Sequence, residues 1–215
     1  QHLMAKTGCS VTTLFERSAA IFMHRPYHRM PQTALAGIYL WSLGLSEDAE
    51  ERECFRVFCE EADVLPEAVL GELRSDIPLW KQAQEAETVR ELYPLTMKVS
   101  KAFRKTSVFE EEILPKLSTG ARTMMTFGNL YSAALPAWLA VGLEEAAGEE
   151  LDWAGRELLL IGYGSGDTAE AMLVRVAPHW REAAESIGVD RALIDPIDLS
   201  RADYEALHDR HQLHE

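Results

Sequence analysis

Two continuous apolar runs along the chain are typical of strands buried in a sheet. The first, 19–23, ends at His24, and the second, 158–161, leads directly into the glycine-rich segment 162–166. A strand that helices cover on both faces loses the usual alternation with polar residues, because neither face meets water. We therefore expect two buried strands, each followed by residues that can bind a ligand. A shorter strand is expected over 123–127.

Apolar residues at helical spacing predict most of the remaining structure. The segment 32–43 shows this spacing and ends near Gly44, a common residue after a helix. The acidic stretch 46–117 is too long to be a loop, so we expect a helical insertion there. Its pattern predicts helices over 49–62, 66–73, 79–92 and 95–109.

The C-terminal part combines clear and ambiguous signals. A helix is expected from about Ser132 to just before Gly148, with Pro136 in its first turn, where a missing N–H costs little. The segment 168–176 fits a strand or a helix by its pattern alone. Ser200 and Asp203 have the spacing of a capping box, which predicts a last helix to about residue 212.

Length and charge restrict the kinds of partner that the chain can have. Its 215 residues, 47% of them hydrophobic, suffice for one compact domain. The formal net charge of −14 would repel nucleic acid and anionic membranes, so neither is an expected partner. An anionic ligand would therefore need a local basic cluster. The longest apolar stretch, 133–143, is too short to span a bilayer.

The cysteines and the first residues predict a cytoplasmic protein. Cys9, Cys54 and Cys59 are odd in number and lack CxxC spacing, which favours free thiols in a reducing compartment. Residues 1–10 have neither the charged nor the apolar region of a secretory signal.

Three segments contain residues capable of chemistry, and each also has a plain structural interpretation. His24 at a strand end could donate to a thioester carbonyl or serve as a buried structural histidine. Zinc binding by His24 and His28 is disfavoured, because Pro26 prevents the helix that would align them. Asn129 before a helix is ordinarily an N-cap, although its amide can also stabilise an oxyanion.

The third segment, 162–166, lets backbone N–H groups approach a ligand closely. It is not a GxSxG nucleophile elbow. Asp167 also occupies the position where a dinucleotide-binding GxGxxG motif has glycine or alanine. A nucleotide-binding domain would need a helix directly after Gly166.

The order and spacing of these segments resemble the C-terminal half of hydroxymethylglutaryl-CoA synthases. The similar segments are FMHRPYHRMPQTAL, FRKTSVFEEEILPKL, FGNLYSAALPAWLA, IGYGSG and LSRADYEALHDRH. The resemblance implies an α/β thiolase-like half over 1–180, with a mixed sheet, covering helices and a helical insertion over about 46–117. It also favours a strand over the ambiguous segment 168–176. Residues 181–215 would form a C-terminal helical tail.

The resemblance also implies roles for individual residues. The catalytic group would comprise His24, which contacts the acetoacetyl thioester, Asn129, which assists acyl binding, and Ser165, whose backbone N–H joins the oxyanion hole. Arg29 stands where the family has a lysine that meets CoA phosphate, and a bidentate arginine can replace it. Tyr131, Gly164 and Gly166 complete the expected substrate-binding set. The role of His28 stays open, and no cofactor or metal is expected beyond the CoA thioester substrates.

The family's cysteine nucleophile and glutamate acid/base lie in its N-terminal half, and no cysteine here has that context. The implied reaction of the mevalonate pathway condenses acetyl-CoA with acetoacetyl-CoA, so the expected partner is a nucleophile-bearing half, within a homodimeric enzyme. Two alternatives stay open. One is a β-branching synthase that acts on carrier-protein-bound acyl groups, and the other is a non-catalytic thiolase-fold subunit.

Overall fold

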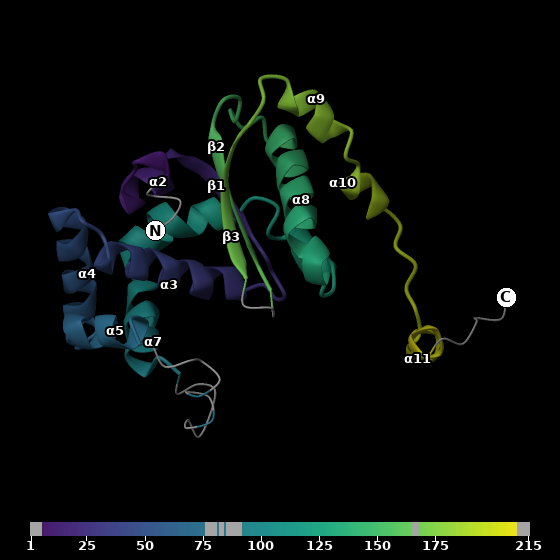
Figure 1. Cartoon of the computed structure of the whole chain (residues 1–215). Coiled ribbons are helices and arrows are strands. Elements are labelled where there is room, and N and C mark those ends of the chain that lie inside the picture. The colour runs from purple at the N-terminus through teal and green to yellow at the C-terminus, as the bar shows by residue number, and fades with distance from the viewer. Residues whose placement is uncertain (1–5, 76–80, 82–83, 85–91, 165–167, 210–215) are drawn as a thin grey trace.

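A mixed sheet forms the centre of the molecule (Figure 1), as the computed structural model of residues 6–75, 81, 84, 92–164 and 168–209 shows. Among these residues, β1 (Ser18–Met23) pairs in parallel with β2 (Glu157–Tyr163), and β2 pairs antiparallel with β3 (Ala169–Arg175). The two apolar runs are therefore the paired strands β1 and β2. The predicted α/β class with a mixed sheet is confirmed.

Helices surround this sheet in the part of the chain that the structure describes. In chain order they are α2 (Val11–Arg17), α3 (Met30–Gly44), α4 (Ala49–Glu61), α5 (Pro66–Leu73), α7 (Pro94–Phe103), α8 (Ala134–Gly148), α9 (Trp180–Glu185), α10 (Val189–Ala192) and α11 (Arg201–His208). A π-helical segment η2 (Val108–Ile113) and the short 3-10 helices η3 (Leu114–Leu117), η4 (Thr123–Thr126) and η5 (Tyr131–Ala133) connect α7 to α8.

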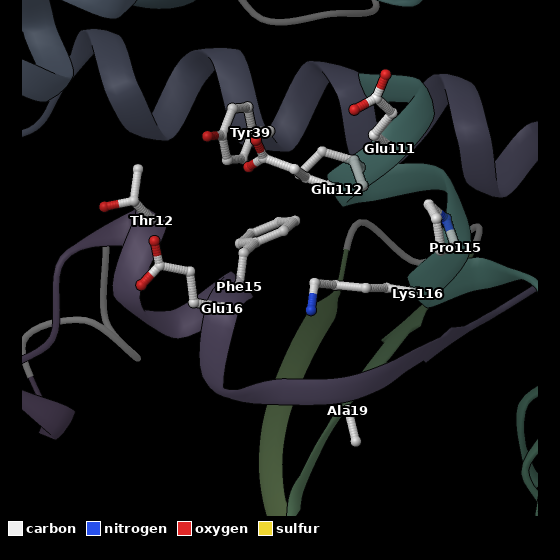
Figure 2. Close-up of a pocket in the computed structure, with 10 residues that line it drawn as sticks. Thr12, Phe15, Glu16, Ala19, Tyr39, Glu111, Glu112, Pro115 and Lys116 are labelled. Carbon is white, nitrogen blue, oxygen red and sulfur yellow. The ribbon is translucent and has the colours of Figure 1, made fainter. Parts of the chain in front are cut away.

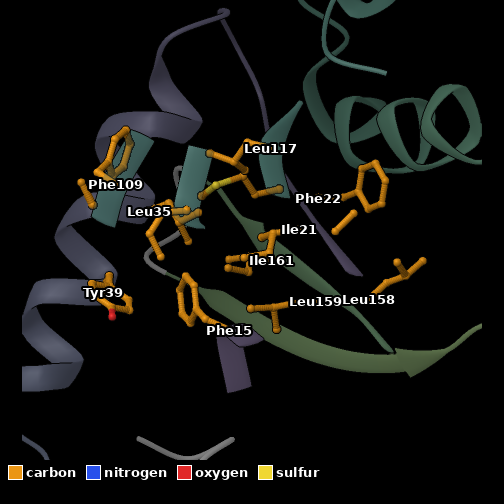
Figure 3. Packing of buried hydrophobic residues seen from close by; sticks show 14 of the residues in the cluster. Phe15, Ile21, Phe22, Leu35, Tyr39, Phe109, Leu117, Leu158, Leu159 and Ile161 are labelled. Atoms are coloured by element: carbon orange, nitrogen blue, oxygen red, sulfur yellow. The ribbon is translucent and has the colours of Figure 1, made fainter. Parts of the chain in front are cut away.

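The two faces of β1 are buried against different layers. Phe22 packs edge-on against Trp138 of α8, with ring centroids 5.6 Å apart. Ile21 points to the opposite side, toward Leu35 of α3 and Leu117 of η3 (Figure 3). Because successive residues of a strand alternate between faces, an apolar run is what this two-sided burial requires.

The helical insertion packs on α3. Helices α4, α5 and α7 contact α3 and one another, and Asp48 caps α4 by accepting from the backbone N–H groups of Glu50 and Glu51. The predicted helix over 79–92 lies outside the described residues except at positions 81, 84 and 92. The helix predicted over 95–109 is instead divided, since α7 ends at Phe103 and η2 begins at Val108. The break lets Phe103 and Phe109 both enter the core, with ring centroids 5.5 Å apart.

The strand predicted over 123–127 was wrong. Residues Thr123–Thr126 form the 3-10 helix η4, in which the N–H of Met125 donates to the carbonyl of Arg122 at 3.0 Å. Met124 is buried whereas Met125 is 60% exposed, so this apolar run does not cross the core as a strand. The sequence pattern did not reveal which of the two methionines would be buried.

The C-terminal elements were predicted more accurately than the segment 123–127. The ambiguous segment 168–176 is the strand β3, and the capping box of Ser200 and Asp203 is present at α11. That helix ends at His208, earlier than expected. The proposed boundary near residue 180 stays a prediction. All three cysteines are free, and no described helix is both long and apolar enough to cross a membrane.

Candidate functional site

His24 lies where the two parallel strands end together. Its backbone N–H donates to the carbonyl of Ile161 at 2.9 Å, which continues the β1–β2 ladder by one residue. Its ring meets the ring of Tyr163 edge to face, with centroids 4.9 Å apart and planes at 82°. Because parallel strands present their carboxyl ends at the same edge, the first and third sequence segments meet there. His24 is half-buried, so one side of its ring is accessible.

Arg25, the next residue, is a buried cation that the sequence did not single out. It is 6% exposed, and its guanidinium lies over the ring of Trp138 at 4.6 Å. One nitrogen donates to the carbonyl of Ala121 at 3.0 Å and to Nδ1 of His28. Burial lowers the pKa of Arg25, although an arginine stays charged at any physiological pH. Arginine is ordinarily exposed, so the burial of Arg25 is evident only from the tertiary structure.

His28 and Arg29 complete the corner before α3. Burial and the neighbouring charges of Arg25 and Arg29 lower the pKa of His28, because each disfavours a second positive charge. Arg29 is exposed and precedes the first residue of α3, without a side-chain bond to the helix. The candidate phosphate contact is therefore accessible at this position.

Asn129 forms an Asx turn just ahead of η5 and is not its N-cap, which is Leu130. Its Oδ1 accepts from the backbone N–H of Tyr131 at 3.0 Å, at the start of η5. Tyr131 is 74% exposed and has a left-handed backbone, with φ of 51°. The bond from Tyr131 occupies the amide oxygen of Asn129. The amide nitrogen of Asn129 can then donate a hydrogen bond to a ligand.

A cavity of about 290 Å³ joins the first and second segments. Arg25 and His28 line it from the corner after β1, and Gly128 and Asn129 line it from the loop before η5. The first and second sequence segments therefore meet at this cavity. His24 is not among the residues that line this cavity.

Of the glycine-rich segment 162–166, the structure describes Gly162, Tyr163 and Gly164. Gly164 is exposed, and its N–H donates to the carbonyl of Thr168 at 3.3 Å, which closes the connection from β2 to β3. Ser165 and Gly166 lie outside the described residues. The hydroxyl of Tyr163 is buried and has no hydrogen-bond partner among the described residues. Burial, followed by the nearby Tyr27, raises the pKa of Tyr163.

A larger cavity, of about 570 Å³, opens at the other end of β1 (Figure 2). Lys116 donates to the carbonyl of Ser18 at 2.8 Å, and burial lowers the pKa of Lys116. Burial raises the pKa of Tyr39 to about 12, with a smaller effect from Glu112. No sequence motif predicted this cavity. Within the described ranges, no cluster of three histidine, cysteine or acidic side chains could hold a metal ion.

Comparison with known proteins first defines the class of fold. The structure is similar to a solved chain described as MvaS in complex with 3-hydroxy-3-methylglutaryl coenzyme A, with a TM-score of 0.56 and 21% sequence identity. The likeness covers 90% of this chain and 34% of the solved one. This protein therefore has a thiolase-like fold. No protein-family model matches the sequence.

The sequence comparison adds a similar protein with a known activity. Over 99 residues the chain is 35% identical to the hydroxymethylglutaryl-CoA synthase of Haloferax volcanii, a match that covers 46% of this chain and 21% of that relative. This match supports the expected resemblance to hydroxymethylglutaryl-CoA synthases, and the partial coverage fits their C-terminal half. The predicted resemblance is confirmed, whereas the residue roles stay predictions.

Proposed function

We propose that this chain supplies the acetoacetyl-CoA-binding part of a 3-hydroxy-3-methylglutaryl-CoA synthase. The observation that carries the proposal is the position of His24. It lies where β1 and β2 end together, and its ring contacts Tyr163, the last residue of β2. Its family relatives and the structural neighbour in complex with the product thioester support the same substrate class.

In the proposed reaction His24 donates a hydrogen bond to the acetoacetyl group. Its backbone is fixed by the bond to Ile161, and its ring is held by Tyr163. A donor whose position is set before the substrate binds stabilises the charge that develops on oxygen without reorganisation at the moment of reaction. Ser165 would add its backbone N–H, with Gly164 and Gly166 leaving room for the thioester.

The other residues would hold the substrate in place. The free amide nitrogen of Asn129 can donate to an acyl oxygen, with Tyr131 beside it. Arg29, exposed ahead of α3, would meet a phosphate of CoA. The cysteine that takes the acetyl group, and the carboxylate that deprotonates its methyl, would come from a separate nucleophile-bearing half, in a homodimeric assembly.

The direct test compares the chain alone with the chain supplied with that half. Release of CoA from acetyl-CoA and acetoacetyl-CoA is measured in both, and with the added half's nucleophilic cysteine changed to alanine. We expect turnover only when this chain and the intact half are together. Robust activity from this chain alone would contradict the proposal, because Cys9, Cys54 or Cys59 would then be acting as a nucleophile.

A second kind of substrate separates the proposal from its alternatives. Turnover with carrier-protein-bound acyl groups, but not with the CoA thioesters, would identify a β-branching synthase. If the assembled pair is folded yet inactive with both kinds of donor, the chain is a non-catalytic partner. The net charge of −14 makes nucleic acid an unsuitable partner in either case.

A further inference from the structure

The 290 Å³ cavity beside Asn129 contains a buried charge without a counter-ion. Arg25 lines it and is 6% exposed, yet no carboxylate pairs with this arginine in the part of the chain that the structure describes. Its hydrogen-bond partners, the carbonyl of Ala121 and Nδ1 of His28, are both neutral. Burying a cation is costly unless an anion compensates it. The positive charge of Arg25 is therefore available to a ligand.

The other polar groups around this cavity are also arranged to donate. A guanidinium has only donors, so Nδ1 of His28 must accept from Arg25, and the ring proton then resides on Nε2. The Oδ1 of Asn129 accepts from Tyr131, which leaves the amide nitrogen as the free group. Arg25, His28 and Asn129 thus offer donors from both walls of one cavity.

The charge around this corner is opposite to that of the chain as a whole. The chain carries 35 acidic and 21 basic residues, but no aspartate or glutamate is among the described residues that line this cavity. A neighbouring cavity of about 250 Å³ shares Arg25 and His28, adds Arg122, and likewise has no acid in its described lining. The cavity at the other end of β1, in contrast, contains Glu16, Glu111 and Glu112.

We propose that Arg25 and His28, with Asn129, form a binding subsite for an oxyanion of the substrate. A carboxylate or a phosphate is recognised by a guanidinium through paired hydrogen bonds. The source of the oxyanion rests on the proposed function. It is either the free carboxylate of the 3-hydroxy-3-methylglutaryl group or a phosphate of CoA.

Titration calorimetry on the full chain tests the subsite without catalysis. The probes are free 3-hydroxy-3-methylglutarate, adenosine 3′,5′-bisphosphate and, as an uncharged control, the dimethyl ester of the first. We expect one of the two anions to bind and the ester not to bind. His28→Ala and Arg25→Lys should each weaken binding about tenfold or more, because charge-assisted and bidentate bonds are lost.

Arg122→Gln is the matched control. It removes one positive charge from the neighbouring cavity and none from the lining of the 290 Å³ cavity. This variant should bind the anion as the wild type does. His28 is exposed, so His28→Ala should keep the fold even if the change at buried Arg25 does not, and circular dichroism melting curves check both variants.

Three results of the calorimetry would overturn the subsite. The subsite is excluded if neither anion binds, if His28→Ala binds the anion as the wild type does, or if Arg122→Gln weakens binding as much as His28→Ala does. Binding of the carboxylate or of the bisphosphate supports the subsite and identifies the source. Oxyanion binding without synthase activity in the assembled pair would refute the proposed function alone, whereas synthase activity without oxyanion binding would refute the subsite alone.

Discussion

The rings of His24 and Tyr163 meet edge to face at 4.9 Å, although His24 directly follows β1 and Tyr163 ends β2, far apart in the sequence. The contact exists because β1 and β2 run parallel, with Met23 opposite Ile161, and therefore end at the same edge of the sheet. It fixes the orientation of the histidine ring while leaving part of it accessible. Two of the predictions below concern this pair.

His24→Ala should impair the use of acetoacetyl-CoA more than the transfer of acetyl to the nucleophile in the assembled enzyme. Loss of one prepositioned donor raises the barrier by on the order of 3 kcal/mol. Separate measurement of acetyl transfer and of the complete condensation distinguishes the two steps. His179→Ala, which changes an exposed histidine before α9, should alter neither. Equal losses in both steps would refute the assignment of His24 to the second substrate.

Tyr163→Phe should leave the free energy of unfolding unchanged or raise it by about 1 kcal/mol. The hydroxyl is buried without a hydrogen-bond partner in the described residues, so its removal relieves an unsatisfied polar group and keeps the ring contact with His24. Urea unfolding of both proteins measures the difference. A loss of more than about 1 kcal/mol would mean that the hydroxyl has a stabilising partner.

Gly142→Ala should destabilise the protein by about 1 to 3 kcal/mol, as overpacking of a core does. Gly142 lies where α8 crosses β1, and a methyl group there would overlap the ring of Phe22. Gly148→Ala is the control in the same helix, because nothing lies within 4 Å of its added methyl group. The control should be neutral or stabilising, since alanine is the better helix former. Thermal unfolding of the two variants decides between these outcomes.

Glu51 should make folding stability fall as the pH is lowered. This carboxylate is 4% exposed and accepts from the N–H and the hydroxyl of Thr12, both at 2.8 Å, and from Ser46. Burial alone would raise the pKa of Glu51, but the hydrogen bonds from Ser46 and Thr12 outweigh it and lower the pKa below its ordinary value of 4.5. The unfolded chain therefore binds the proton more readily, and stability is lost as the pH falls from 4.5 through the lower pKa of the folded protein.

Glu51→Gln should flatten this pH dependence and cost about 1 to 3 kcal/mol at neutral pH, because a charged acceptor is replaced by a neutral amide. Urea unfolding between about pH 3 and pH 7 measures both effects. Glu47→Gln, at an exposed position just before α4, should retain the slope of the wild type. If the two variants have the same slope, Glu51 does not contribute in this way.

Local signals in the sequence determined most of the elements of this protein. The apolar runs became β1 and β2, Pro66–Leu73 became α5 with the predicted limits, and Ser200 with Asp203 capped α11. Each of these signals acts between near neighbours, through side-chain periodicity or a short hydrogen bond, so the sequence displays it directly. The family resemblance likewise rested on continuous segments.

Only the tertiary structure decided which residues became neighbours and which became buried. The segment 168–176 became a strand because β2 offered its second edge to it, and the apolar run at 123–127 remained outside the sheet. The sequence pattern predicts an exposed Arg25. Its guanidinium nevertheless lies over the ring of Trp138, in a helix that begins more than a hundred residues later. Pairing and burial of this kind depend on packing between distant segments, and local pattern carries little information about such packing.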